Sequence, residues 1–170
     1  MTSPLNAKRR WATLGLVVFA LGGLGLAAEH APALALVNES PSLPKGVYVR
    51  RPAARPTPGA VVAVRQPNVA RAYLGELGMP APVLLIKRVA AVEGDPVCRR
   101  GFGLQTPERV VTAHLVDRRG RALPQWRDCR RLRAGEFFLL GDTADSFDSR
   151  YFGPVRAGEI KGVYQAVVSW

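Results

Sequence analysis

One lysine lies inside a segment that the sequence otherwise predicts to be a buried β-strand. Residues 83–92, VLLIKRVAAV, are apolar except for Lys87 and Arg88. Because alternate side chains of a strand share one face, Lys87 is expected to share its face with Leu85 and Val89. Burial disfavours the ammonium form and lowers the pKa of a lysine. Lys87 therefore either extends to solvent or lies desolvated, where its neutral form would be a general base.

A lysine base needs a nucleophile, and Ser42 is the candidate. It lies in residues 40–44, SPSLP, where two prolines restrict the backbone of a loop. Serine is a weak nucleophile unless a base is adjacent, and a serine–lysine pair is a known variant of the serine-hydrolase site. Taken alone, a serine between prolines is more often a turn residue.

A third segment is rich in hydroxyl and carboxylate side chains. Residues 141–153, GDTADSFDSRYFG, directly follow the apolar strand expected over 136–140. A solvated turn or a calcium loop is the plain alternative, but the glycine and the final glutamate of an EF-hand loop are not at their positions. A polar loop attached to a buried strand suits a network that orients a catalytic group.

The elements that must position these residues are mostly short strands. Turn signals bound apolar runs, and one stretch has helical spacing, which together predict a mainly β domain. Residues 29–46 are expected to be an irregular connection. Residues 97–133, with weak periodicity and many charges, are expected to be a small insertion of strands and turns. The expected strands are 47–49, 61–64, 83–92, 136–140 and 163–170, and the expected helix is 68–77.

The N-terminal segment predicts a membrane anchor. Residues 11–28 carry no charge and follow a basic cluster in residues 1–10, and a helix of this length covers about 27 Å, nearly a hydrocarbon core. The basic cluster favours a cytoplasmic N-terminus, which places residues 29–170 in the periplasm of a single-pass inner-membrane protein. The alternative is a cleavable secretion signal ending near 33–35, ALA, although the apolar run is long for one. Both alternatives export the rest of the chain.

Cys98 and Cys129 would then lie in an oxidising compartment. A disulfide between them would contribute roughly 3–4 kcal/mol by chain entropy, and two unpaired buried thiols are the alternative. Two cysteines and two scattered histidines have no ligand spacing, so we expect no metal and no cofactor.

Much of the net charge of +11 comes from arginines in residues 99–133. No nucleic-acid motif accompanies them, so a solvated face is favoured and no nucleic-acid partner is expected.

Taken together, the three segments resemble a known family. SPSLP, IKRVAAVEGD and GDTADSFDSRYFGPV are similar to the three signature boxes of type I signal peptidases, which are membrane-anchored serine–lysine proteases, and they follow the family's order behind an N-terminal anchor. The first box, NESPSLPKGVY, is more similar to the conjugal-transfer (TraF-type) branch, which processes pilin precursors. Signal peptidases proper usually carry a methionine after the nucleophile and one more residue before the proline. The third box is also one residue shorter here.

The resemblance implies a signal-peptidase-like antiparallel β-sheet domain and a role for each matching residue. Ser42 would be the nucleophile and Lys87 the general base. Ser40 would supply a hydroxyl that supplements the Ser42 N–H in the oxyanion hole, and Ser146 a hydroxyl that hydrogen-bonds the lysine. The supporting residues implied by the third box are Asp142, linked to activity or local structure, and the pair Asp148 and Arg150, which buttresses the site.

The implied activity is cleavage of leader peptides from exported precursors at the bilayer face, with propilin maturation in conjugative transfer favoured over general secretory processing. The partners would be a precursor leader segment and the lipid bilayer. A non-catalytic periplasmic assembly factor would explain the anchor and the arginines but not Lys87. Residues 42–45 also match the S-x-x-K motif of penicillin-binding proteins, but they do not predict a helix. The sharpest expectation is that Lys87 is buried, with its Nζ within hydrogen-bond reach of Ser42 Oγ and of Ser146 Oγ.

Overall fold

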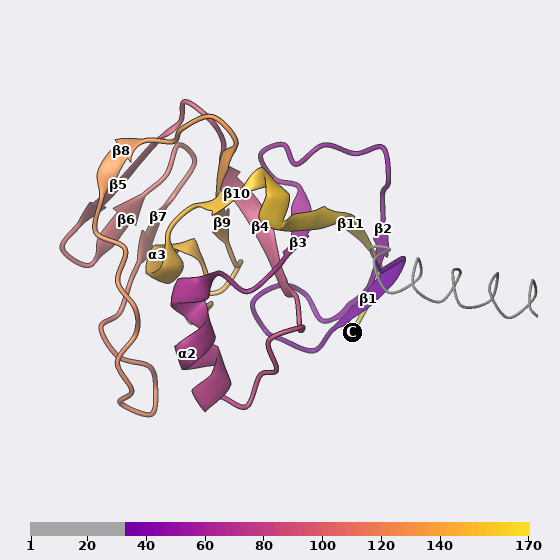
Figure 1. Cartoon of the computed structure of the whole chain (residues 1–170), viewed down its shortest axis with the longest axis horizontal. Coiled ribbons are helices and arrows are strands. Elements are labelled where there is room, and N and C mark those ends of the chain that lie inside the picture. The colour runs from indigo at the N-terminus through magenta and orange to yellow at the C-terminus, as the bar shows by residue number, and fades with distance from the viewer. Residues whose placement is uncertain (1–32) are drawn as a thin grey trace, which may run out of the picture. The chain divides into compact units, whose positions relative to one another are not determined.

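The computed structural model describes residues 33–170 (Figure 1). The basic N-terminus expected over 1–10 and the anchor expected over 11–28 lie outside the described residues. Within 33–170, no helix has both the length and the apolar character needed to cross a membrane.

The larger part of the fold is a seven-stranded sheet in which every neighbouring pair is antiparallel. Turn residues bound short apolar runs, and the resulting strands are short, as the sequence predicts. The mainly β fold is therefore confirmed. In spatial order the strands are β1 (Ala35–Asn38), β2 (Gly46–Arg50), β11 (Ile160–Ser169), β3 (Val61–Val64), β4 (Leu85–Ala91), β9 (Glu136–Leu140) and β10 (Val155–Arg156).

Strand β1 corrects the expectation of an irregular connection over 29–46. Ala35 to Asn38 pair in register with Val49 to Gly46, so β1 and β2 form a hairpin whose loop contains Ser42. Four residues carry too little periodicity to indicate a strand by themselves. The pairing with β2 fixes the conformation instead.

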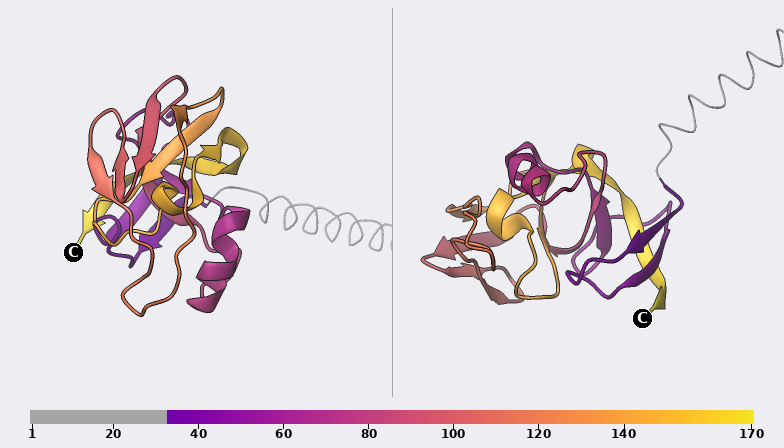
Figure 2. Two further views of the ribbon diagram at one scale, coloured as in Figure 1. Left: turned by 90° about the vertical axis from the view of Figure 1, so that its left-hand side faces the viewer. Right: turned by 90° about the horizontal axis from the view of Figure 1, so that it is seen from below.

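A second, four-stranded antiparallel sheet coincides with most of the segment expected as an insertion, and lies at one side of the molecule (Figures 1 and 2). Cys98 and Cys129 occupy directly opposite positions on two of its strands and form a disulfide, so the alternative of two unpaired thiols is wrong. The strands of this sheet are β7 (Val110–Thr112), β6 (Gly103–Gln105), β5 (Pro96–Arg100) and β8 (Cys129–Arg131).

The helices are few. The helix expected over 68–77 is α2 (Asn68–Glu76), which buries Ala70, Tyr73 and Leu74. A four-residue helix, α3 (Ser149–Phe152), lies within the third polar segment, and a 3-10 turn, η1 (Ala157–Glu159), precedes β11. Helices α2 and α3 are in contact (Figure 2).

Strand β4 is buried on both of its faces. Its neighbours in the sheet are β3 and β9, and six of its seven residues are buried. Leu85 and Val89 belong to the core beneath α2, whereas Ala90 and Ala91 belong to a cluster shared with the second sheet. This double coverage explains why a lysine within β4 is buried.

Candidate active site

Lys87 and Ser42 meet in the structure. Lys87, on β4, lies opposite Val62 of β3. It is 4% exposed, as is Ser42 in the β1–β2 loop. Lys87 Nζ donates a hydrogen bond of 2.8 Å to Ser42 Oγ. The lysine is therefore desolvated rather than extended to solvent, and its nitrogen is placed to receive the hydroxyl proton when it is neutral.

Burial shifts the ionisation of this lysine. Desolvation lowers the pKa of Lys87 from 10.5 to about 8; the nearby Asp148 carboxylate opposes the shift, and Arg150 adds to it. The neutral, basic form of Lys87 is thus accessible near neutral pH, whereas the neutral form of an ordinary lysine is not.

The loop that carries Ser42 is organised by hydroxyl and amide groups. Ser40 Oγ lies 2.9 Å from Ser42 Oγ and accepts a hydrogen bond of 3.2 Å from the Ser42 N–H. The Nδ2 of Asn38, the buried last residue of β1, donates to the carbonyls of Ser40, Leu43 and Pro44. Sequence reasoning missed Asn38, although an asparagine next to a proline-rich turn is a recognisable signal of such bonding.

Tyr48 supports the same loop from β2. It is 2% exposed, and its hydroxyl donates a hydrogen bond of 2.7 Å to the Pro44 carbonyl. The loop is therefore held at both of its ends by side chains of the hairpin that carries it.

The third polar segment approaches the loop through Gly141. The Asp142 N–H donates a hydrogen bond of 2.6 Å to the Ser42 carbonyl. A Cβ at position 141 would lie 2.1 Å from Ser146 Oγ and 2.9 Å from the Ser42 carbonyl oxygen, so no side chain fits there. This glycine lets the segment lie directly against the loop that carries Ser42.

Asp148 and Arg150 form a fully buried ion pair that holds the segment in place. Their side chains are 0% and 1% exposed, and Arg150 Nε donates to Asp148 Oδ1 at 2.8 Å. Asp148 Oδ2 accepts from the Gly141 N–H at 2.8 Å, and Arg150 donates to the carbonyls of Thr143 and Ala144. Since both charges have several hydrogen bonds, their desolvation is compensated.

Asp142 does not touch the Lys87–Ser42 pair through its carboxylate. It accepts two hydrogen bonds from Arg88 on β4, at 2.9 and 2.8 Å, which lower the pKa of the Asp142 carboxyl. Asp142 therefore ties the polar segment to the strand that carries Lys87.

Ser146 does not hydrogen-bond Lys87, and that part of the expectation is wrong. Its hydroxyl is buried and has no hydrogen-bond partner among residues 33–170. Ser146 Oγ lies against Gly141, within 2.1 Å of where a Cβ at that position would be.

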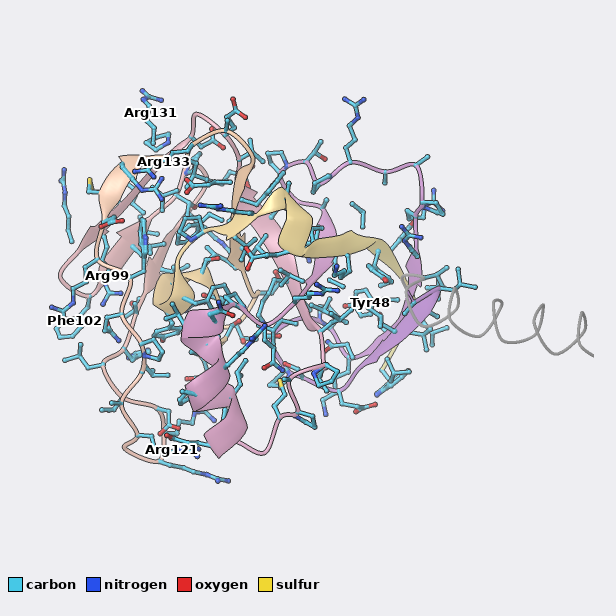
Figure 3. The ribbon with its side chains drawn as sticks, viewed as in Figure 1. Tyr48, Arg99, Phe102, Arg121, Arg131 and Arg133 are labelled. Carbon is cyan, nitrogen blue, oxygen red and sulfur yellow. A yellow bond between two sulfur atoms is a disulfide. The ribbon has the colours of Figure 1, made fainter. Side chains whose placement is uncertain are left out.

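The second sheet braces the polar segment with arginines that sequence reasoning missed. Arg109 donates to the Gly141 carbonyl at 3.0 Å, and Arg118 pairs with Asp145. Arg99, buried, donates to the Arg150 carbonyl at 3.5 Å. Because these contacts join distant parts of the chain, only the high arginine content of the insertion signalled them. Arg99, Arg121, Arg131 and Arg133 are spread over this region rather than forming one stripe (Figure 3).

A cavity of about 460 Å³ opens beside the Lys87–Ser42 pair. Its polar end carries Ser40, Ser42, Lys87 and Ser146, and the rest is largely apolar, with walls from α2 and from the chain leading into β4. No group of three His, Cys, Asp or Glu side chains that could hold a metal ion was found within 33–170. The arrangement suits attack by a serine on an extended peptide whose side chains enter apolar subsites.

Three comparisons place the chain among known proteins. The family model described as "Signal peptidase, peptidase S26" matches residues 8–170. Two proteins from Escherichia coli, each named "Plasmid transfer protein TraF", are 31% and 34% identical over 169 and 167 residues; the matches cover 92% and 89% of this chain and 94% of each relative. A crystal structure of a signal peptidase I from Enterococcus faecalis V583 matches 65% of this chain and 97% of its own, at 20% identity and a TM-score of 0.38.

Proposed function

The chain belongs to the signal peptidase family, peptidase S26, and from this premise we propose that it is a serine endopeptidase with a Ser42–Lys87 dyad. The observation that carries the proposal is the 2.8 Å hydrogen bond from a buried lysine of lowered pKa to a buried serine hydroxyl. A buried charge is unfavourable unless it is paired, and none of the carboxylates near Lys87 is bonded to its Nζ within residues 33–170. A buried group with a strongly shifted pKa is typical of a functional site.

The reaction follows from the geometry. Neutral Lys87 takes the proton of Ser42 Oγ as the oxygen attacks the scissile carbonyl, and it then gives this proton to the departing amine. The Ser42 N–H, which donates to Ser40 Oγ in the free protein, turns to the developing oxyanion, with the Ser40 hydroxyl as a second donor. One such donor contributes about 3–4 kcal/mol. Water then releases the acyl group from Ser42, or an amine does so if the product is cyclised.

The substrate would be the leader segment of an exported precursor. The apolar cavity beside the dyad suits small and apolar residues before the cleaved bond. Because both curated relatives are plasmid transfer proteins, we favour maturation of a pilin precursor in conjugative transfer. General secretory processing is the alternative and uses the same site.

The enzyme would act at the periplasmic face of the inner membrane, anchored by residues 11–28. Exposed apolar side chains at one end of strands β1 and β11 support this placement, since such patches mark membrane or protein contacts. They are Val37 of β1, Val168 of β11 and the adjacent Trp170, which are 64%, 56% and 62% exposed. The Trp170 N–H donates to the carbonyl of Lys45, which lies in the same loop as Ser42.

The test is cleavage of candidate precursors by the detergent-solubilised full chain, followed by mass spectrometry, which reports cleavage site and product topology together. Ser42→Ala and Lys87→Ala should each lower the rate roughly 10⁴-fold. Ser169→Ala and Lys45→Ala, at exposed positions, are the matched controls and should leave the rate unchanged. Processing at the wild-type rate by both dyad variants would exclude the catalytic role and favour a non-catalytic assembly factor. Equal rates on unrelated secretory precursors would favour the general peptidase.

A further inference from the structure

A second cavity, of about 300 Å³, lies at the opposite end of β2 from the nucleophile loop. Three cationic side chains line it, those of Arg50, Arg51 and Lys161. No carboxylate is among the residues that line it, and none of the three cations forms an ion pair with a carboxylate within residues 33–170. Like charges repel, so this grouping is unfavourable unless an anion joins it.

The backbone is shaped to bring these cations together. Ile160 pairs with Val64 and Gly162 pairs with Ala63, so Lys161 is the extra residue of a bulge in β11. A bulge redirects the side chain it carries, and here Lys161 lines the same cavity as the end of β2. A Cβ at Gly162 would lie 3.0 Å from Arg50 Nε, so the glycine leaves room for the arginine.

One donor in this cluster lacks an acceptor. Arg50 Nε is buried and has no hydrogen-bond partner among the described residues. A buried N–H without an acceptor is destabilising. A ligand with strong acceptor oxygens would satisfy it and neutralise the surrounding charge at once.

We propose that this cavity binds a phosphate group through Arg50, Arg51 and Lys161. The planar fork of a guanidinium matches two phosphate oxygens, and a lysine adds a point charge. The phosphate can belong to a free ion or to the headgroup of an anionic phospholipid. The Arg50 N–H donates to the Leu34 carbonyl, so the cavity lies where the N-terminal segment joins the sheet. The anchor that the sequence predicts ends at residue 28, and the connection to Leu34 spans at most about 20 Å.

The test uses the full chain in an uncharged detergent, with ionic strength matched by sodium chloride. The probes are inorganic phosphate, dihexanoyl phosphatidylglycerol and dihexanoyl phosphatidylcholine, the lipids below their micelle concentrations. Affinity is measured by calorimetry and by the shift of the thermal midpoint. Arg51→Gln and Lys161→Gln should each weaken binding about fivefold. Arg71→Gln, an exposed position on α2, removes the same charge elsewhere and should leave the affinity unchanged.

Repulsion among the three cations should also be visible in the stability of the protein without a ligand. Without phosphate and at low salt, Lys161→Gln should raise the thermal midpoint, whereas loss of a merely structural lysine would lower it. Binding of phosphatidylglycerol but not of inorganic phosphate supports the site with a lipid as its source, and the reverse supports it with a free ion. The proposal is overturned if phosphate acts no differently from chloride, if Arg71→Gln weakens binding as much, or if phosphatidylcholine binds as well as phosphatidylglycerol. Peptide cleavage in detergent is measured separately, so a failure to bind phosphate would not count against the Ser42–Lys87 dyad.

Discussion

Replacing Lys87 by methionine is expected to change how the free energy of unfolding depends on pH. In the folded protein the pKa of Lys87 is lowered from 10.5 to about 8 by burial. Below pH 8 both the folded and the unfolded chain hold the proton, and the folded chain carries a buried charge. Between pH 8 and 10.5 only the unfolded chain holds it, so unfolding takes up a proton and stability rises with pH.

The magnitude follows from the difference between the two pKa values. Each pH unit inside this window adds about 1.4 kcal/mol, so Lys87 adds roughly 3 kcal/mol to the stability of the wild type between pH 7 and 10.5. At pH 7 the wild type still carries the cost of the buried charge, which the methionine variant never has. The variant should therefore be more stable than the wild type at pH 7, by up to roughly 3 kcal/mol less the packing change, and this advantage should disappear as the pH rises to 10.5. It should also lose peptide cleavage.

The assay is denaturant unfolding of wild type and variant from pH 6.5 to 10.5, compared as a difference at each pH. Tyrosines whose pKa burial raises, such as Tyr151 and Tyr164, titrate in both proteins and cancel. Lys45→Met, which removes an exposed lysine, is the control for the change of residue type. A difference between wild type and Lys87→Met that does not vary with pH would mean that Lys87 keeps an ordinary pKa, and the argument for a neutral base would fail.

Four further outcomes are expected. The rate of peptide cleavage under kcat/KM conditions should rise about tenfold from pH 7 to pH 9, because the neutral fraction of a base of pKa about 8 rises from roughly a tenth to nine tenths. Asp148→Asn breaks the buried pair with Arg150 and should lower the free energy of unfolding by about 3–5 kcal/mol in denaturant titrations. Gly141→Ala, whose Cβ has no room, should slow cleavage at least about tenfold, whereas Gly158→Ala, which meets nothing within 4 Å, should not. Reducing the disulfide between β5 and β8, whose cysteines are separated by 31 residues, should lower the free energy of unfolding by roughly 3–4 kcal/mol, which thermal denaturation would detect as a lower midpoint.

The parts of the fold that local pattern determines were predictable from the sequence. Apolar runs bounded by turn residues indicated β3, β4 and β9, and helical spacing indicated α2. Lys87 was conspicuous because it interrupts such a run. Its pairing with Ser42, 45 residues earlier in the chain, came from chemical need and from the family resemblance rather than from any local signal.

The parts that depend on contacts between distant residues were not predictable. Strand β1 exists through its pairing with β2, and the four residues alone do not specify it. Arg109 donates to the carbonyl of Gly141, 32 residues later in the chain, and nothing near Arg109 in the sequence predicts this hydrogen bond. The hydroxyl of Ser146 was assigned to the lysine by resemblance, but it lies against Gly141 without a hydrogen-bond partner among residues 33–170.

The position of β11 has a consequence for when activity can arise. This strand, the last along the chain, lies between β2 and β3, and within residues 33–170 it is the only backbone ladder that joins the β1–β2 hairpin to the rest of the sheet. Ser42 and Lys87 therefore lie on two parts of the sheet that are joined through the pairing of β11. We expect a chain that lacks β11 to leave Ser42 and Lys87 apart, so that peptide cleavage requires this last strand to pair with both of its neighbours.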